Sequence, residues 1–262
     1  MRKLACALTS SSLLPRNGPK MQLDILAFGA HPDDVELYAA GTLAKMAAQG
    51  YATGIVDMSR GELGTRGTPA LRAREARNAA RVLGLKVREN LGLPDGRIPV
   101  TPQARLLVIR MLRKYRPEIV MVHHWDERHP DHVNTSHLVT QAAHHAGLAK
   151  IQTGQQRFRP NSILYFMLPA HQPPSFIVDV SDFTEQRQAA IRSYGSQLFD
   201  PESREPATYL SHPDFVTQVE NVHSYYGALI GRARGEGFYT RGVMEVHDPV
   251  VFFRQQARNR LR

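Results

Sequence analysis

The chain has 262 residues, of which 42% are hydrophobic, 22% charged and 8% aromatic, a composition typical of one folded domain. It excludes collagen, a disordered chain and a disulfide-rich miniprotein, and the apolar runs fall far short of the ~20 residues that a membrane span needs. The 33 basic residues outnumber the 24 acidic ones, which gives a net charge of +9. The single cysteine, Cys6, has no partner in the chain for a disulfide, so we expect a cytoplasmic location.

Basic residues concentrate in two stretches, between Arg60 and Arg81 and again between Arg254 and Arg262. Neither stretch has the basic stripe interleaved with aromatic residues that is typical of nucleic-acid binding, so we expect no nucleic-acid partner. The first stretch is explained either by a solvent-exposed basic face or by an anion-binding lid.

The predicted elements begin after a flexible leader of residues 1–20, and Met21 offers an alternative start. Compact apolar runs predict buried strands, and apolar spacing of three and four predicts helices between them. Gly50 and Gly84 are suited to end two of the helices, and Thr101 with Pro102 to begin another. The predicted strands are Leu23–Ala30, Ala52–Met58 and Ile119–Val122, and the predicted helices are Asp34–Gln49, Ala70–Leu83, Gln103–Lys114, Val133–Ala146 and Phe183–Tyr194.

This alternation of strands and helices predicts an α/β fold, a three-layer α/β/α Rossmann-like arrangement around a mostly parallel sheet. The second half is less regular, but no repeat or low-complexity linker separates it from the first. We therefore expect one domain over residues 21–240, followed by a basic C-terminal tail at residues 241–262.

A first group of polar residues, His31-Pro32-Asp33-Asp34, follows the first predicted strand. A tight turn into a helix aims His31 and Asp34 at one point, and Pro32 constrains the backbone there. Histidine with carboxylate suits Zn²⁺ or another divalent transition metal, which leaves Asp33 free to act as a base. Taken alone, the same aspartates are explained equally well as helix caps.

A second group, His129-Pro130-Asp131-His132, opens a helix after the strand Ile119–Val122. Seven of the twelve histidines lie between His123 and His145. Sites in open α/β sheets form at the carboxyl ends of strands, so both groups are expected at one crevice. His132 then supplies a third metal ligand, and Asp131 holds one nitrogen of His129.

The two groups resemble the signatures of the LmbE-like (PIG-L-type) zinc-dependent N-acetylglucosamine deacetylases. The resemblance runs from about Leu23 to Phe238 and rests on DILAFGAHPDDVE at Asp24–Glu36 and DERHPDHVN at Asp126–Asn134. Longer and weaker matches are similar to the branch that deacetylates N-acetylglucosaminyl-malate in bacillithiol biosynthesis. The resemblance implies a small amino-sugar conjugate as substrate and a homo-oligomer, such as a hexamer.

The resemblance also implies residue roles. Asp33 matches the general base, and His129, with Asp131 behind it, matches the protonated residue that stabilises the oxyanion. Glu127 stands where some branches carry a tyrosine near the oxyanion. Zinc, or Fe²⁺ or another divalent transition metal, is expected at the three residues that match the family's metal ligands: His31, Asp34 and His132.

Arginines are the expected substrate contacts. Arg72 matches a substrate-contacting arginine of the family, and a malyl dicarboxylate favours a bidentate guanidinium such as that of Arg72 or Arg66. Arg128 is a further candidate because it lies next to His129. A solvated helix face or a surface ion pair also explains these arginines. The predicted activity releases acetate from N-acetylglucosaminyl-malate. The alternatives are another conjugate, such as chitobiose, a different thiol precursor or a glycolipid headgroup, or a metal- or sugar-binding protein without catalysis.

Overall fold

The computed structural model describes residues 21–260, so the predicted leader lies outside the described residues. Its centre is a five-stranded sheet with the order β3-β2-β1-β4-β5, in which every neighbouring pair is parallel. The strands are β1 (Ile25–Gly29), β2 (Thr53–Asp57), β3 (Val87–Asn90), β4 (Ile119–His123) and β5 (Ser162–Phe166). The predicted α/β class with a mostly parallel sheet is confirmed.

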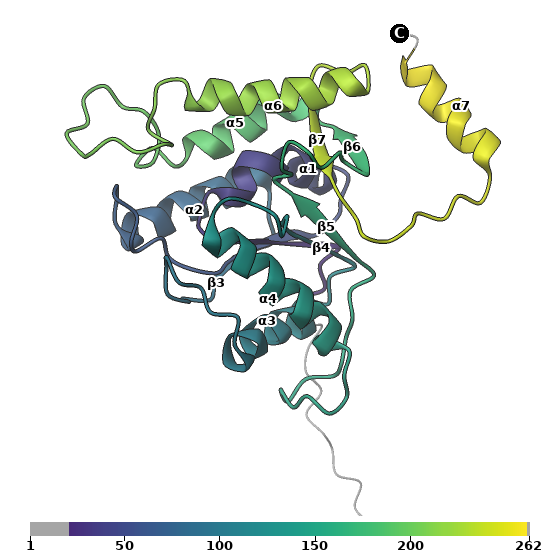
Figure 1. The fold of residues 1–262 in the computed structure, drawn as a ribbon, viewed down its shortest axis with the longest axis horizontal. Coiled ribbons are helices and arrows are strands. Elements are labelled where there is room, and N and C mark those ends of the chain that lie inside the picture. The colour runs from purple at the N-terminus through teal and green to yellow at the C-terminus, as the bar shows by residue number, and fades with distance from the viewer. Residues whose placement is uncertain (1–20, 261–262) are drawn as a thin grey trace, which may run out of the picture.

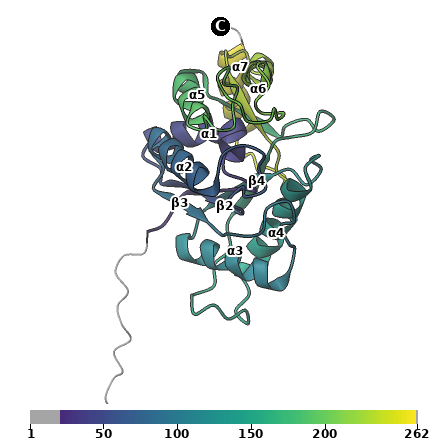
Figure 2. The same ribbon diagram turned by 90° about the vertical axis from the view of Figure 1, so that its left-hand side faces the viewer.

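Helices cover both faces of the sheet (Figure 1). Leu26 and Phe28 of β1 pack in a core with α3 (Pro102–Tyr115) and α4 (Pro130–Ala146). Ile25 and Ala27 alternate with them and point to the other face, as the period of a strand requires. That face is covered by α1 (Asp34–Ala48), α2 (Pro69–Leu83) and α5 (Thr184–Arg192), and Figure 2 shows the resulting layers edge-on.

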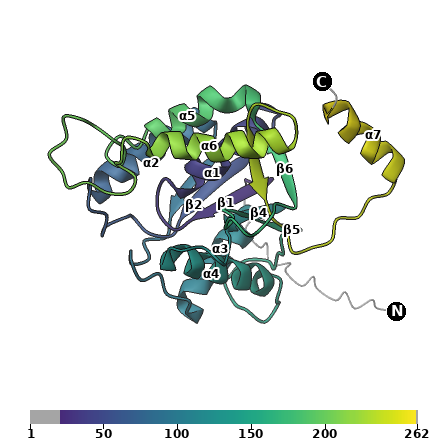
Figure 3. The ribbon, with the colours of Figure 1, turned by 45° about the horizontal axis from the view of Figure 1, so that its top comes forward.

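The second half of the chain completes the same body. A short 3-10 helix, η1 (Ser181–Phe183), leads into α5, and α6 (Phe215–Leu229) packs over α1 and α5 through Phe215 and Val219. The antiparallel pair β6 (Phe176–Asp179) and β7 (Gly235–Phe238) lies beside α1, and a bridge between Tyr165 and Tyr239 joins it to β5. Within the predicted tail, α7 (Pro249–Arg260) stands apart from this body (Figure 3).

Helix ends follow the local sequence. The hydroxyl oxygens of Thr68 and Thr101 accept hydrogen bonds from the backbone N–H groups of Leu71 and Ala104, and a proline follows each threonine. Gly84 ends α2 in the left-handed conformation. Among residues 21–260, no helix combines the length and hydrophobicity that a bilayer crossing requires.

Candidate metal centre and active site

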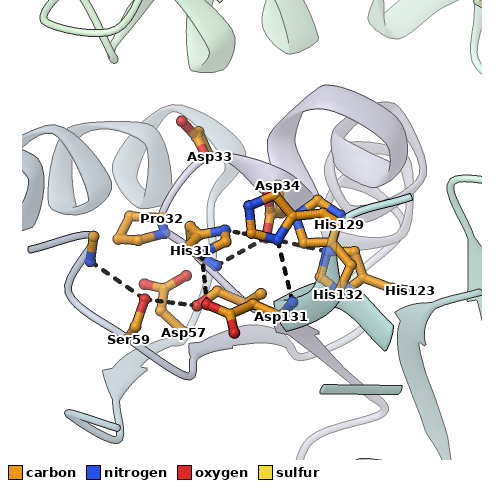
Figure 4. A network of polar contacts seen from close by, with 12 residues as sticks. His31, Pro32, Asp33, Asp34, Asp57, Ser59, His123, His129, Asp131 and His132 are labelled. Atoms are coloured by element: carbon orange, nitrogen blue, oxygen red, sulfur yellow. Dashed lines mark hydrogen bonds and ion pairs between the residues drawn. The ribbon is translucent and has the colours of Figure 1, made fainter. Parts of the chain in front are cut away.

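The two predicted polar groups meet at the end of the sheet where the carboxyl termini of its strands lie. β1 and β4 are neighbours, yet the chain continues from β1 to β2 on the other side, so their carboxyl ends form a topological switch point. His31 and Asp34 lie just past β1, while His132 lies in the first turn of α4 (Figure 4). Segments about 100 residues apart in the chain therefore face one another, as the sequence predicts.

Three donor atoms converge there. His31, Asp34 and His132 each offer one ligand atom, and these atoms lie within 4.8 Å of one another. Nε2 of His132 is 3.3 Å from Oδ1 of Asp34, and Nδ1 of His31 is 3.5 Å from Oδ2 of the same carboxylate. Two imidazoles and a carboxylate form the donor set of a catalytic metal site, with coordination positions left for substrate and water.

The outer nitrogen of each histidine contacts a carboxylate. Nδ1 of His132 is 2.8 Å from Oε2 of Glu127, and Nε2 of His31 is 3.0 Å from Oδ1 of Asp95. Such contacts fix the tautomer and ring orientation of metal-binding histidines. Asp34 is positioned in turn by the backbone N–H of His31 at 2.8 Å and by Nε2 of His123 at 3.1 Å. The residues thus fit a divalent cation.

Proton affinity in the site points the same way. Burial lowers the pKa of His132, but the charge of Asp34 and hydrogen bonds to Asp34 and Glu127 outweigh it and raise that pKa to about 9. Burial likewise lowers the pKa of His31, and the charge of Asp34 again reverses the sign, so the pKa lies well above its ordinary value. The carboxylates therefore favour positive charge where the three donors meet.

Two of these carboxylate contacts are not predicted by the sequence: Asp95 with His31, and Glu127 with His132. Asp95 follows β3, a strand with three polar residues of four, so no hydrophobic signal marks it as lying at the same sheet edge. Pro94-Asp95-Gly96 is a turn signal that indicates a loop there. Only the sheet order brings that loop to His31.

The structure corrects the role predicted for Asp131. Its carboxylate accepts hydrogen bonds from the backbone N–H groups of Gly96 at 2.7 Å and Ile98 at 2.9 Å, and lies 3.4 Å from Nε2 of His31. The contact with His129 instead runs from the backbone N–H of Asp131 to Nδ1, at 3.2 Å. Asp131 therefore supports a metal donor and the loop after β3, because the helix start directs its carboxylate toward them.

His129 stands beside the metal donors. Its ring stacks on that of His132, with centroids 4.6 Å apart. Because Nδ1 accepts a hydrogen bond from the backbone N–H of Asp131, the neutral ring carries its hydrogen on Nε2. Burial, followed by the charges of His132 and His31, lowers the pKa of His129. The structure therefore favours a neutral Nε2–H donor over the protonated ring expected from the sequence.

Asp33 lies outside the donor set. Its carboxylate stands apart from the His–Asp–His group (Figure 4), is almost fully buried, and receives a hydrogen bond from Arg72 at 2.9 Å. Burial, opposed by the charge of Arg72, raises the pKa of Asp33 to about 7. The backbone of Asp33 has φ 118°, a strained conformation for a residue other than glycine. A buried carboxylic acid with this pKa is suited to exchange protons at neutral pH.

A cavity of about 440 Å³ opens at this site, and its lining includes the three candidate metal donors together with Asp33 and His129. Two of the three predicted substrate arginines, Arg72 and Arg128, are on its wall. Arg72 also donates to the carbonyl oxygen of Pro32, so it holds the turn that carries Asp33. The third, Arg66, is not on the wall: it is buried and donates to the carbonyl oxygen of Leu198 at 3.1 Å and to Oγ of Ser203 at 2.7 Å.

Comparisons with known proteins agree with this geometry. The family described as "PIG-L: GlcNAc-PI de-N-acetylase" matches residues 26–143. Diacetylchitobiose deacetylase of Thermococcus kodakarensis is 28% identical, and the match covers 81% of each chain. A probable N-acetyl-alpha-D-glucosaminyl L-malate deacetylase 2 of Bacillus anthracis is 24% identical over 68% of this chain and 83% of the relative.

Among solved structures, that of the conserved protein TT1542 from Thermus thermophilus is similar over the whole body. It has a TM-score of 0.77 and 38% identity, and the match covers 86% of this chain and 98% of that one. The shared fold, the family match over the segments that carry both metal motifs, and these relatives together show that the chain belongs to the PIG-L (LmbE-like) deacetylase family.

Proposed function

We propose that the chain hydrolyses the N-acetyl group of an N-acetylglucosamine conjugate, with Zn²⁺ held by His31, Asp34 and His132. The observation that supports this most directly is the convergence of two imidazoles and a carboxylate beside an acid, Asp33, that is not part of the donor set. Fe²⁺ suits the same donors. Metal analysis of the purified protein beside activity after reconstitution with each ion identifies the working metal.

The chain's own residues supply the proton transfers. When bound, a divalent cation lowers the pKa of water from 15.7 to about 7 and polarises an amide carbonyl oxygen. Asp33 accepts a proton from the attacking water while the oxygen of that water forms a bond to the acetamide carbon. The C–N bond then breaks, and the same proton passes to the departing amine. General acid–base assistance of this kind contributes about 10²- to 10⁴-fold.

His129 stabilises the oxygen that becomes negative. Its Nε2–H is a neutral donor on the wall of the cavity, beside the metal donors. A donor of this kind contributes about 3–4 kcal/mol to the transition state. Glu127, in the place of the tyrosine of some branches, contacts His132 and accepts from the backbone N–H of His129 at 2.7 Å, so it positions both rings.

The conjugate is proposed to be uncharged next to the sugar. The malyl group predicted from the sequence favours a bidentate arginine, Arg72 or Arg66, but Arg66 is bound to a neighbouring loop and Arg72 is paired with Asp33. That leaves Arg128, whose guanidinium lies 4.5 Å from the centre of the Tyr209 ring. A chitobiose-type conjugate is therefore favoured over N-acetylglucosaminyl-malate.

The test is acetate release by the metal-loaded protein from N,N'-diacetylchitobiose, N-acetylglucosaminyl-malate and free N-acetylglucosamine. We expect the highest kcat/KM with the disaccharide. No acetate from any of them, with metal bound at full occupancy, would overturn the proposal and favour a binding protein without catalysis. The homo-oligomer, the cytoplasmic location and the absence of a nucleic-acid partner stay predictions.

A further inference from the structure

A second cavity, of about 310 Å³, adjoins the one at the metal donors. The two share a wall made by four residues: Tyr38, Glu127, Arg128 and Met167. Tyr38 lies one turn after Asp34 on α1, and Met167 directly follows β5. The second cavity therefore lies directly beside the one at the metal donors, separated from it by these four side chains.

The far side of the second cavity is mainly apolar. α6 contributes Val222 and Tyr226, which are one helical turn apart and therefore on one face. Leu168 and Pro169 lie on the wall that follows β5. Gly237 of β7 makes room for the tyrosine ring, because a Cβ there would lie 2.8 Å from a ring carbon of Tyr226. This lining suits the apolar face of a ring.

The charges around the second cavity oppose an anion. Its polar residues outside the core are Asp126, Glu127 and Arg128, two carboxylates against one guanidinium. The buried Glu236 accepts from the backbone N–H groups of Gly41 and Thr42, at 2.8 and 2.7 Å, so α1 already occupies both of its oxygens. A dicarboxylate would meet like charge here, whereas a neutral ligand would not.

Backbone strain marks the shared wall. In the part of the chain that the structure describes, three residues other than glycine have positive φ: Asp33, Arg116 and Met167. Asp33 lines the first cavity, and Met167, with φ 56°, lines both. Strain of this kind is concentrated at ligand sites, where the surrounding structure holds a side chain in a costly conformation.

We infer that the second cavity binds the group attached to the N-acetylglucosamine, and that this group is an uncharged ring with an apolar face, such as a second pyranose. The inference rests on the proposed deacetylase activity, which places the N-acetyl group in the cavity at the metal centre and so leaves the adjoining cavity for the rest of the conjugate. Val222 and Tyr226 of α6 then select the conjugate, while the metal centre acts on its N-acetyl group.

Filling the cavity tests the inference. Val222→Trp places an indole in the second cavity, and Asn221→Trp, at the adjacent exposed position, is the matched control. We expect Val222→Trp to lower kcat/KM for N,N'-diacetylchitobiose at least tenfold and to leave that for free N-acetylglucosamine within twofold. Asn221→Trp is expected to change neither. Equal losses on both substrates, or no loss on either, overturn the inference.

Removing the ring face gives a second test. Tyr226→Ala is expected to raise KM for the disaccharide about tenfold, and the exposed neighbour Tyr225, changed to Ala, provides the control. A higher kcat/KM of the wild-type protein for N-acetylglucosaminyl-malate than for the disaccharide overturns the uncharged class.

The proposed function can fail separately. If the zinc-loaded wild-type protein releases no acetate from any probe, calorimetric binding of N,N'-diacetylchitobiose decides the inference alone. Affinity lost in Val222→Trp and kept in Asn221→Trp supports the second cavity as a sugar subsite. No binding, or equal binding to both variants, overturns it.

Discussion

Glu127 illustrates how single residues hold the metal centre without joining it. Its carboxylate fixes the ring of His132 from behind, and contacts of this kind are worth about 10- to 100-fold in metal affinity. We expect Glu127→Gln to weaken zinc binding by that factor, measured by competition with a chromophoric chelator. Asp126→Asn is the control, since Asp126 is exposed and contacts only His171 among the ion pairs of the described residues. Equal zinc affinity in the two variants contradicts the assignment.

Asp33 has a role distinct from that of its neighbour Asp34. Because its carboxylate lies outside the donor group, Asp33→Asn is expected to keep the metal and lose about 10²- to 10⁴-fold in kcat. Asparagine is chosen because it tolerates positive φ better than most residues. Steady-state rates and metal content are measured on the same sample. Near-normal turnover of the fully loaded variant rules Asp33 out as the base.

The raised pKa of His132 makes metal binding depend on pH. In the metal-free chain its ring is protonated below about pH 9, whereas a metal binds only the neutral ring. Each displaced proton therefore raises the apparent zinc affinity about tenfold per pH unit as pH increases toward that value. Calorimetry in buffers of different ionisation enthalpy counts the protons released. Zinc binding without proton release contradicts the assignment.

At the scale of elements, local signals predicted the three candidate metal donors but not the carboxylates that contact them. His31, Asp34 and His132 stand in two short motifs that each follow a strongly apolar strand, so strand and ligand are recognised together. Asp95 has no such marker, because β3 is polar and short. The second cavity depends on α6 and β7, and GEGF at β7 has little strand propensity of its own.

Glu236 ties the β7 strand to α1, because its carboxylate accepts hydrogen bonds from the backbone N–H groups of Gly41 and Thr42. A Cβ on Gly41 would lie 2.9 Å from both Oε1 of Glu236 and Cβ of Val180, so only glycine allows this approach. In an open helix Gly→Ala gains about 1 kcal/mol, but overpacking costs about 1–3 kcal/mol and a lost hydrogen bond to a charged group about 1.5–3 more.

We therefore expect Gly41→Ala to lower the free energy of unfolding by about 2–5 kcal/mol, measured by urea denaturation. Gly195→Ala is the control, because a Cβ at Gly195 meets no atom within 4 Å and its φ is negative. A stabilised Gly41→Ala variant would mean that Glu236 does not insert into the helix as described.

At the scale of the molecule, the fold and the metal centre are separable. The two large cores lie on either side of the sheet and are built from apolar side chains. The candidate metal donors lie outside both cores, beyond the carboxyl ends of β1 and β4. When no metal is bound, protons on His31 and His132 offset the negative charge of the neighbouring carboxylates, since both histidines have raised pKa values. The apo chain should therefore remain folded.

Chelation and reloading test this separation. We expect a chelator to abolish acetate release and leave the far-ultraviolet circular dichroism spectrum unchanged at about 25 °C, with activity restored by zinc. Zinc at about 1,000 times its Kd adds about 4 kcal/mol of stability by mass action and so raises Tm, whereas His132→Ala loses most of that rise. Unfolding of the chain on chelation would show that the ion holds the β1 and β4 loops together, and the sheet alone would then not account for the architecture.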